Sequence, residues 1–452
     1  MTHRQLKTGY FALAGLNTIA SSYYFNYLFF FLRDQFGFGD KENLCISALH
    51  GLVYIFAAVQ CGKFAERRGN LLSLKIGFAC LTVSMVIGAF LQGTTALFLL
   101  VAGYTTVLLF TWPALESLVS TRESRAGVQR MVGIYNCTWA GAAAFAYFTG
   151  GKLYDVFGRG AIFWLPAGIF AVQFIFTLWL EKQIPVTRPA DTWPTNEPTP
   201  SPSQEGSEKG SDTADARLLF PSSEGLGVGS DKTNGTPHSP EADGRARHSV
   251  RAGLGQTDDG AHGVTRPTLS PKAFLKMAWL ASPFAYIAIN TLLAVMPGIA
   301  GKLGLSPTRV GLFCSIWFFG RFIAFLLLWK WAGWHYRFRW LLGAFLLLIG
   351  SFMAILLAHD LWIVIVAQVF FGFAPGLIYY SSLFYSMDVG EASSEHSGWH
   401  EAFIGVGIFA GPAVGALALQ LAPENPNAGT WAVTALLVCG LVGLVWLRVR
   451  RK

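Results

Sequence analysis

Apolar stretches of about twenty residues recur from one end of this 452-residue chain to the other. A helix rises about 1.5 Å per residue and the hydrocarbon core of a bilayer is about 30 Å thick, so each stretch is long enough to cross it. The first six predicted spans are 9–32, 43–64, 71–92, 96–118, 131–151 and 160–180. The other six are 274–300, 308–330, 339–358, 361–386, 397–420 and 428–448. The sequence therefore predicts an all-α membrane protein with twelve transmembrane helices.

The composition excludes several other classes of protein. Only 13% of the residues are charged, against about 25% in soluble domains, so a soluble enzyme is not expected. Six cysteines in so long a chain do not make a disulfide scaffold, and none has metal-ligand spacing. The basic residues are spread between the apolar stretches rather than gathered in one patch, so we expect no nucleic-acid partner.

The spans fall into two sets of six, separated by a stretch of different composition. Residues 186–270 contain nine of the 20 prolines and no apolar periodicity, which predicts a disordered cytoplasmic linker. Residues 1–185 and 271–452 are then two six-helix bundles. Residues 133–141 align with residues 398–406 at matching places in the two sets. Parallel repeats of six spans, related by an axis normal to the membrane, are typical of transporters.

The basic residues also predict the orientation of the chain. Lysine and arginine gather in the short segments on the side of the N-terminus, for example Lys63, Arg67 and Arg68, and are scarcer on the other side. Such residues mark cytoplasmic segments, so both termini are expected to face the cytoplasm. The first apolar stretch is too long for a cleaved signal peptide, and we expect it to be retained. The expected protein is a monomer in the plasma (inner) membrane, with the lipid bilayer as its surroundings.

A charged loop flanked by glycines follows the second span, with the sequence Gly62-Lys-Phe-Ala-Glu66-Arg67-Arg-Gly69. It resembles the signature loop of the major facilitator superfamily, Gly-x-Leu-Ala-Asp-Arg-x-Gly, which also lies between the second and third spans. Phe64 and Glu66 depart from the family pattern. The resemblance implies two pseudo-symmetric bundles that rock about a central cavity, with Glu66 helping to close the cytoplasmic side against the start of the span 397–420. The alternative is that the charged residues only mark a cytoplasmic loop.

A second glycine pattern lies in the span 397–420, with the sequence Gly407-Ile-Phe-Ala-Gly411-Pro412-Ala-Val-Gly415. It resembles a family pattern that normally stands in the fifth helix of antiporters, so its place in the eleventh span does not imply an antiporter. Glycines four residues apart let a neighbouring helix come close, and a proline inside a helix allows bending. The pattern fits a moving helix contact and a static one equally well.

Burying a polar side chain in the bilayer costs free energy, so each polar side chain inside a predicted span needs a structural or functional explanation. In three spans they form stripes on one helix face, with spacings of three or four residues. In the family that the chain resembles, helices 1, 4, 7 and 10 line the central cavity, and the three stripes lie on three of these four helices. We therefore predict a substrate cavity, the alternative being hydrogen bonds between helices. The predicted cavity residues are Asn17, Ser21, Tyr24, Tyr27, Tyr286, Asn290, Gln368 and Tyr379.

Arg321 adds a charge midway along the span 308–330. An arginine at the centre of a bilayer costs about 2.5–3.5 kcal/mol and keeps its charge, so it needs a carboxylate, a carbonyl or an anionic substrate. Glu116 and Glu401 are the acids within the spans, and Glu401 is expected about six residues of depth away, too far for a direct bridge. We predict that Arg321 lies in the cavity wall and contacts an anionic substrate group or a structural acid.

Glu401 and His400 are adjacent at the start of the span 397–420. A carboxyl group beside an imidazole can exchange protons near neutral pH, which predicts a proton-coupling site. The alternative is that both side chains lie at the membrane surface, where Glu401 caps the start of a helix.

The expected function is transport of a small solute by alternating access, either secondary active, with protons as the candidate coupling ion, or facilitative. The chain has no Gly-x-x-x-x-Gly-Lys-Ser/Thr loop, so ATP is not the expected source of energy. We expect no cofactor, no metal and no enzymatic activity. The solute is expected to be neutral and amphipathic, or a monoanion bound by Arg321. The alternative function is that of a non-transporting sensor or scaffold on the same fold, which would signal through residues 186–270.

Overall fold

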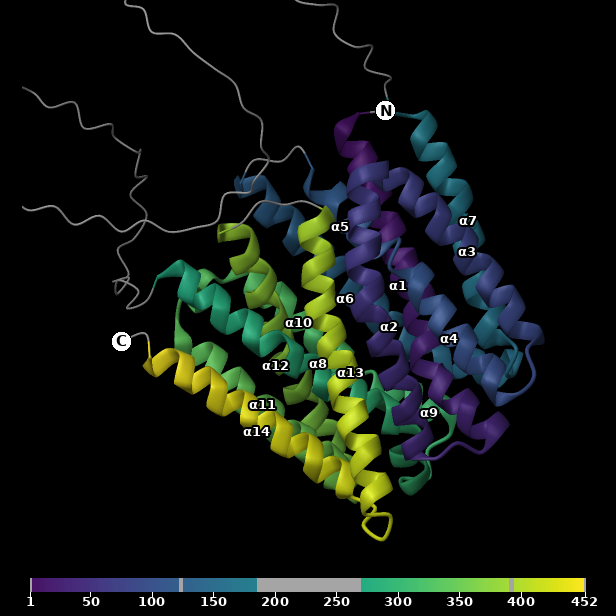
Figure 1. Ribbon diagram of the computed structural model, residues 1–452, viewed down its shortest axis with the longest axis vertical. Helices are drawn as coiled ribbons and strands as arrows, with labels where there is room; N and C mark the ends of the chain where they lie inside the picture. Colours follow the sequence, from purple (N-terminus) through teal and green to yellow (C-terminus); the bar gives the residue numbers. More distant parts are fainter. Residues whose placement is uncertain (1, 122–124, 185–269, 390–393, 451–452) are drawn as a thin grey trace, which may run out of the picture. The chain divides into compact units, whose positions relative to one another are not determined.

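The structure is a computed structural model that describes residues 2–121, 125–184, 270–389 and 394–450. These residues form helices joined by short connections and contain no strand (Figure 1). The first half contains α1 (His3–Phe36), α2 (Asp40–Arg68), α3 (Asn70–Phe90), α4 (Thr94–Leu108), α5 (Trp112–Ser120), α6 (Arg125–Phe157) and α7 (Ala161–Lys182). The second half contains α8 (Pro271–Lys302), α9 (Pro307–Cys314), α10 (Ile316–Lys330), η1 (Ala332–Trp334), α11 (Phe338–Leu357), α12 (Leu361–Val389), α13 (Ser394–Leu421) and α14 (Ala428–Val449).

Each of the twelve predicted spans corresponds to one helix or to two consecutive helices, which confirms the all-α fold class. Among the described residues, ten of these segments are long and apolar enough to cross a membrane. The two others are α1 and α6, both of which place polar or aromatic side chains on the interior cavity described below. Phe56, Leu99 and Trp362 are at least two-thirds exposed. Exposed apolar side chains of this size suit helix faces that meet lipid.

Two of the predicted spans are each divided into two helices. The span 96–118 is interrupted between Leu108 and Trp112, just before Pro113. A proline has no backbone N–H and clashes with the carbonyl four residues earlier, so the helix breaks ahead of it. The span 308–330 is interrupted at Ser315, between α9 and α10.

Helices α2 and α13 lie side by side and run in opposite directions, joining the two halves of the chain (Figure 1). Glycines bring their backbones into direct contact. A Cβ atom on Gly51 would lie 2.2 Å from the backbone nitrogen of Phe409, and one on Gly398 would lie 3.2 Å from the Cα atom of Gly62. Near the other end of this contact, Lys41 Nζ donates a hydrogen bond to Gln420 Oε1 at 3.2 Å.

Helix α6 makes a second contact between the halves, against α9 and α10. A Cβ atom on Gly151 would lie 2.0 Å from the carbonyl oxygen of Pro307, and one on Gly133 would lie 2.6 Å from the Trp329 ring. We call the end of the molecule that contains Gly62, Gly133 and Gly398 the Gly62 end. The opposite end, which contains Gly151, Pro307 and Gln420, is the Gly151 end. The two halves therefore contact each other at both ends.

The glycine pattern of α13 does bring a neighbouring helix close. Cβ atoms on Gly407 and Gly411 would lie 2.2 Å and 2.6 Å from carbonyl oxygens of α8. Gly415 faces α2 instead, where a Cβ atom would lie 3.3 Å from the Leu44 side chain. Pro412 lies within α13, which continues through it to Leu421. The structure thus gives the pattern a packing role.

The predicted linker over 186–270 lies outside the described residues, except for Ser270, which directly precedes α8. The helices of residues 1–185 and of residues 271–452 pack into one compact unit. The exact boundaries at residues 185 and 271 stay predictions.

Candidate functional site

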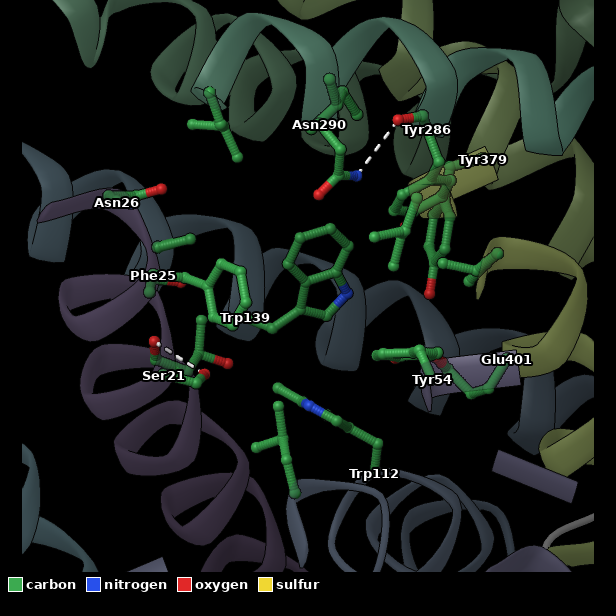
Figure 2. A pocket seen from close by; sticks show the side chains of 18 of the residues that line it. Ser21, Phe25, Asn26, Tyr54, Trp112, Trp139, Tyr286, Asn290, Tyr379 and Glu401 are labelled. Atoms are coloured by element: carbon green, nitrogen blue, oxygen red, sulfur yellow. Dashed lines mark hydrogen bonds between the residues drawn. The ribbon is translucent and has the colours of Figure 1, made fainter. Parts of the chain in front are cut away.

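A cavity of about 210 Å³ lies between the two halves. Most of its wall comes from α1, α2, α5 and α6 of the first half and from α8, α10, α12 and α13 of the second. Figure 2 shows Trp139 projecting into the middle of the cavity, with Phe25 and Asn26 on one side and Tyr286 and Tyr379 on the other. A solute in this cavity would contact both halves at once.

Arg321 is the one arginine or lysine among the described residues that line the cavity, and it is 4% exposed. Its guanidinium carbon lies 4.6 Å from the centre of the Trp139 ring, 5.2 Å from Tyr379 and 5.6 Å from Phe325. Aromatic faces attract a cation at such distances. Arg321 Nη2 donates a hydrogen bond to Tyr286 Oη at 3.3 Å. Within the described residues its Nε has no hydrogen-bond partner and no carboxylate forms an ion pair with it.

The acidic side of the cavity is built around Glu401. Tyr54 Oη of α2 donates a hydrogen bond to the Glu401 carboxylate of α13, and Figure 2 shows the two side chains next to each other. The Glu116 side chain of α5 lies beside it in the cavity wall. Two carboxyl groups so placed can share a proton, because a protonated carboxyl group can donate a hydrogen bond to an ionised one. This arrangement can hold a proton between the two halves.

His50 lies one helical turn before Tyr54 and also lines the cavity. Its Nδ1 lies 2.7 Å from Thr105 Oγ1, and that hydroxyl donates to the carbonyl of Val101 at 2.6 Å. Because a hydroxyl has one proton to donate, we assign the proton of this hydrogen bond to Nδ1, which leaves Nε2 as an acceptor.

Five of the nine predicted cavity residues line the cavity. They are Ser21, Tyr286, Asn290, Arg321 and Tyr379. Arg321 and Glu401 both lie in its wall without an ion pair between them, as the expected difference in depth suggested. The polar stripe of α8 thus faces the cavity, and α1 and α12 contribute one residue each from their predicted stripes.

The four other predicted residues face neighbouring helices instead. They are Asn17, Tyr24, Tyr27 and Gln368. Asn17 Nδ2 donates to Thr111 Oγ1 at 3.1 Å, and Tyr27 Oη donates to the carbonyl of Tyr147 at 2.7 Å. The ring of Tyr24 packs on a tyrosine of α4. These three positions fit the alternative interpretation of hydrogen bonding and packing between helices. Gln368 is fully buried, and its amide has no hydrogen-bond partner among the described residues.

His400 is buried but does not line the cavity; the centre of its ring lies 5.9 Å from that of Tyr379. In the structure, Tyr54 rather than His400 contacts the Glu401 carboxylate.

The residues of the charged loop lie at the Gly62 end. Gly62 is buried where α2 meets the start of α13, whereas Glu66 and Arg67 are exposed at the end of α2. Gly69 joins α2 to α3 with a φ of 97°, a conformation that glycine adopts at little cost. Gly62 is thus the residue of this loop whose close contact with the start of α13 the structure shows. A role in closing the cavity stays a prediction.

Several residues of the cavity wall escaped the sequence analysis. Tyr54, Trp112, Trp139 and His50 all line it. Trp139 could have been identified from the sequence, because it is a large aromatic residue in the middle of a span rich in alanine and glycine. In the described part of the chain, no group of three His, Cys, Asp or Glu side chains is placed to hold a metal ion.

The comparisons with known proteins agree with this geometry. A model of the family described as Major Facilitator Superfamily matches residues 6–246 and 278–452. No curated protein matches the sequence. A bacterial homolog of the human lysosomal transporter Spinster, solved in an inward-facing and unoccupied conformation, is 13% identical, with a TM-score of 0.58 over 98% of this chain and 95% of that one. A mutant of the nucleoside transporter NupG is 11% identical, with a TM-score of 0.62 over 99% of this chain and 100% of that one. At these identities the two structures establish the fold alone.

Proposed function

The chain belongs to the major facilitator superfamily, and from this premise we propose that it transports a small solute by alternating access, driven by protons. The central observation in support is the cavity between the halves, whose wall combines side chains from nine helices. A solute bound there contacts both halves, so its binding energy can favour one arrangement of the halves over another. We propose a transporter rather than an enzyme.

Alternating access needs two ends that open in turn, and the interfaces suit such a motion. The halves meet at the Gly62 end through Gly62 and Gly398, and at the Gly151 end through Gly151 and Pro307. At least one of these contacts must separate before a solute can enter. Glycines let the two backbones pack directly against each other, so such a contact can hold one end closed in one arrangement and separate in the other. In this proposal Glu66 and Arg67, at the end of α2, belong to the moving surface of the Gly62 end.

Proton coupling is proposed for Glu401, acting with Tyr54 and Glu116. Glu401 is 6% exposed and lines the cavity. Tyr54 of α2 donates a hydrogen bond to it, and Glu116 of α5 lies beside it; both belong to the other half. Gain or loss of a proton at Glu401 changes these interactions, and therefore the stability of the contact between the halves. This gives protonation a direct effect on the motion.

The orientation and location follow from the same proposal. The excess of lysine and arginine on the side of the N-terminus supports a cytoplasmic location of both termini. The Gly62 end is then the cytoplasmic end. We propose the plasma (inner) membrane as the location and a monomer as the working unit.

Counterflow in proteoliposomes tests the transport function. Solutes that raise the melting temperature of the purified full chain are first identified in a screen, and their exchange is then followed with labelled solute. We expect transient accumulation of label in loaded vesicles. In a background without native cysteines, a reducible crosslink between Lys41→Cys and Gln420→Cys, whose native side chains are hydrogen-bonded across the halves at the Gly151 end, is expected to abolish exchange, and its reduction to restore it. Exchange at an unchanged rate while the crosslink is intact would contradict alternating access.

A further inference from the structure

Resting on the transport function proposed above, we infer that the solute is a small monoanion with a flat apolar body, an aromatic carboxylate being the simplest member of the class. Arg321 holds its charged group. The first observation is that Arg321 is buried without a counter-charge. Its side chain is 4% exposed, and within the described residues no carboxylate forms an ion pair with it. A buried charge without a counter-charge is costly, and the solute supplies the missing one.

The hydrogen bonds of Arg321 point to a carboxylate as that group. A guanidinium has five N–H donors in a planar fork that matches the two oxygens of a carboxylate. One donor of Arg321 is engaged by Tyr286 Oη at 3.3 Å. Its Nε has no partner among the described residues. A carboxylate would accept from the donors that remain.

The rest of the wall indicates a flat apolar body. Trp139 and Tyr379 lie against the guanidinium, at 4.6 Å and 5.2 Å, and Phe25 and Trp112 line the cavity beyond them. Aromatic rings favour stacked or edge-to-face contact with another ring. The cavity of about 210 Å³ is large enough to hold one ring with a carboxylate.

A cation or a neutral solute fits the same wall less well. Of the two carboxyl groups of the cavity, Glu116 and Glu401, the second already accepts a hydrogen bond from Tyr54. A cation would also face the positive charge of Arg321. A neutral solute would displace water from the guanidinium and leave its charge uncompensated.

A series of probes that share one shape and differ in charge tests the inference without any variant. Benzoate, benzamide and benzamidinium are titrated by calorimetry into the purified full chain. A hydrogen-bonded charge pair predicts that benzoate binds about 10- to 100-fold more tightly than either other probe. Equal affinities, tighter binding of benzamidinium, or no binding of benzoate would each overturn the inference.

Variants then assign the preference to Arg321. Arg321→Gln is expected to lower the affinity for benzoate to that for benzamide. Arg309→Gln removes an exposed arginine of α9 and serves as the matched control, with unchanged affinity. Retention of the preference for benzoate in a folded Arg321→Gln protein would refute the assignment.

The result is distinguishable from a failure of the transport function. If no solute of any charge exchanges in counterflow, the transport function itself is wrong. If a neutral or cationic solute exchanges while benzoate does not bind, only the monoanion class is wrong.

Discussion

Replacing Gly151 by alanine is expected to open the end of the molecule where α6 meets α9. The added Cβ atom would lie 2.0 Å from the carbonyl oxygen of Pro307, whereas ordinary contact begins at 3.4 Å. The two helices must therefore separate by about 1.4 Å to accommodate the methyl group. Overpacking of this kind costs about 1–3 kcal/mol. Because the cost falls only on arrangements in which the Gly151 end is closed, the equilibrium shifts about 5- to 150-fold toward its opening.

Cys314 provides a native reporter for this shift. It is 2% exposed and stands at the end of α9, the helix that meets Gly151. In a protein that keeps Cys314 and lacks the other five cysteines, its labelling by a water-soluble maleimide follows the opening of this end. We expect Gly151→Ala to raise the labelling rate by about the factor given above.

Gly168→Ala is the matched control, because a Cβ atom on Gly168 of α7 meets nothing within 4 Å. The same substitution there should leave the labelling rate of Cys314 unchanged. Equal rates in the two variants, with melting temperatures that show both to be folded, would refute the reasoning that contact at Gly151 keeps this end closed.

Three further predictions concern the other end, the proton and the segment between the halves. The Cβ atom of Gly398→Ala would lie 2.8 Å from the carbonyl oxygen of Ala58, so this variant should favour opening of the Gly62 end. The labelling rate of Cys314 at the other end should then fall. A higher rate would contradict the claim that one end closes when the other opens. Glu401→Gln should abolish uptake driven by a pH gradient but keep counterflow, whereas Glu424→Gln, an exposed control, should keep both. Deletion of residues 187–265 should leave counterflow within about twofold of the full chain; loss of all exchange would show that the segment is needed for transport.

The succession of spans could be predicted from the sequence because a bilayer imposes a length and an apolar composition on every crossing segment. Arg321 could be identified because a charge in such a segment is rare. The rotation of each helix about its own axis, which decides whether a side chain faces the cavity or a neighbouring helix, could not be predicted in the same way. The spacing of Asn17 and Ser21 places them on related faces of α1, yet Ser21 lines the cavity and Asn17 bonds to Thr111. Periodicity tells which residues share a face but not which neighbour that face meets.

The residues that sequence reasoning missed share a physical cause. Tyr54 lies in a predicted span without a polar stripe of its own, where an aromatic side chain facing the cavity resembles one facing lipid. Its role depends on α13 being its neighbour, a pairing between residues 347 positions apart in the chain. From the sequence alone, the adjacent His400 is the visible candidate partner of Glu401. Contacts of this kind become visible only when the two halves are placed together.

The central claim is that the two ends of the cavity open in turn. Distances between spin labels, measured by double electron–electron resonance on the full chain in lipid nanodiscs, test it most directly. One pair joins Arg68→Cys and Lys330→Cys at the Gly62 end, and a second joins Arg159→Cys and Glu424→Cys at the Gly151 end; all four positions are exposed. Across a change of pH or addition of a bound solute, the account predicts that one distance lengthens as the other shortens. Distances that change together, or that do not change at all, would contradict it.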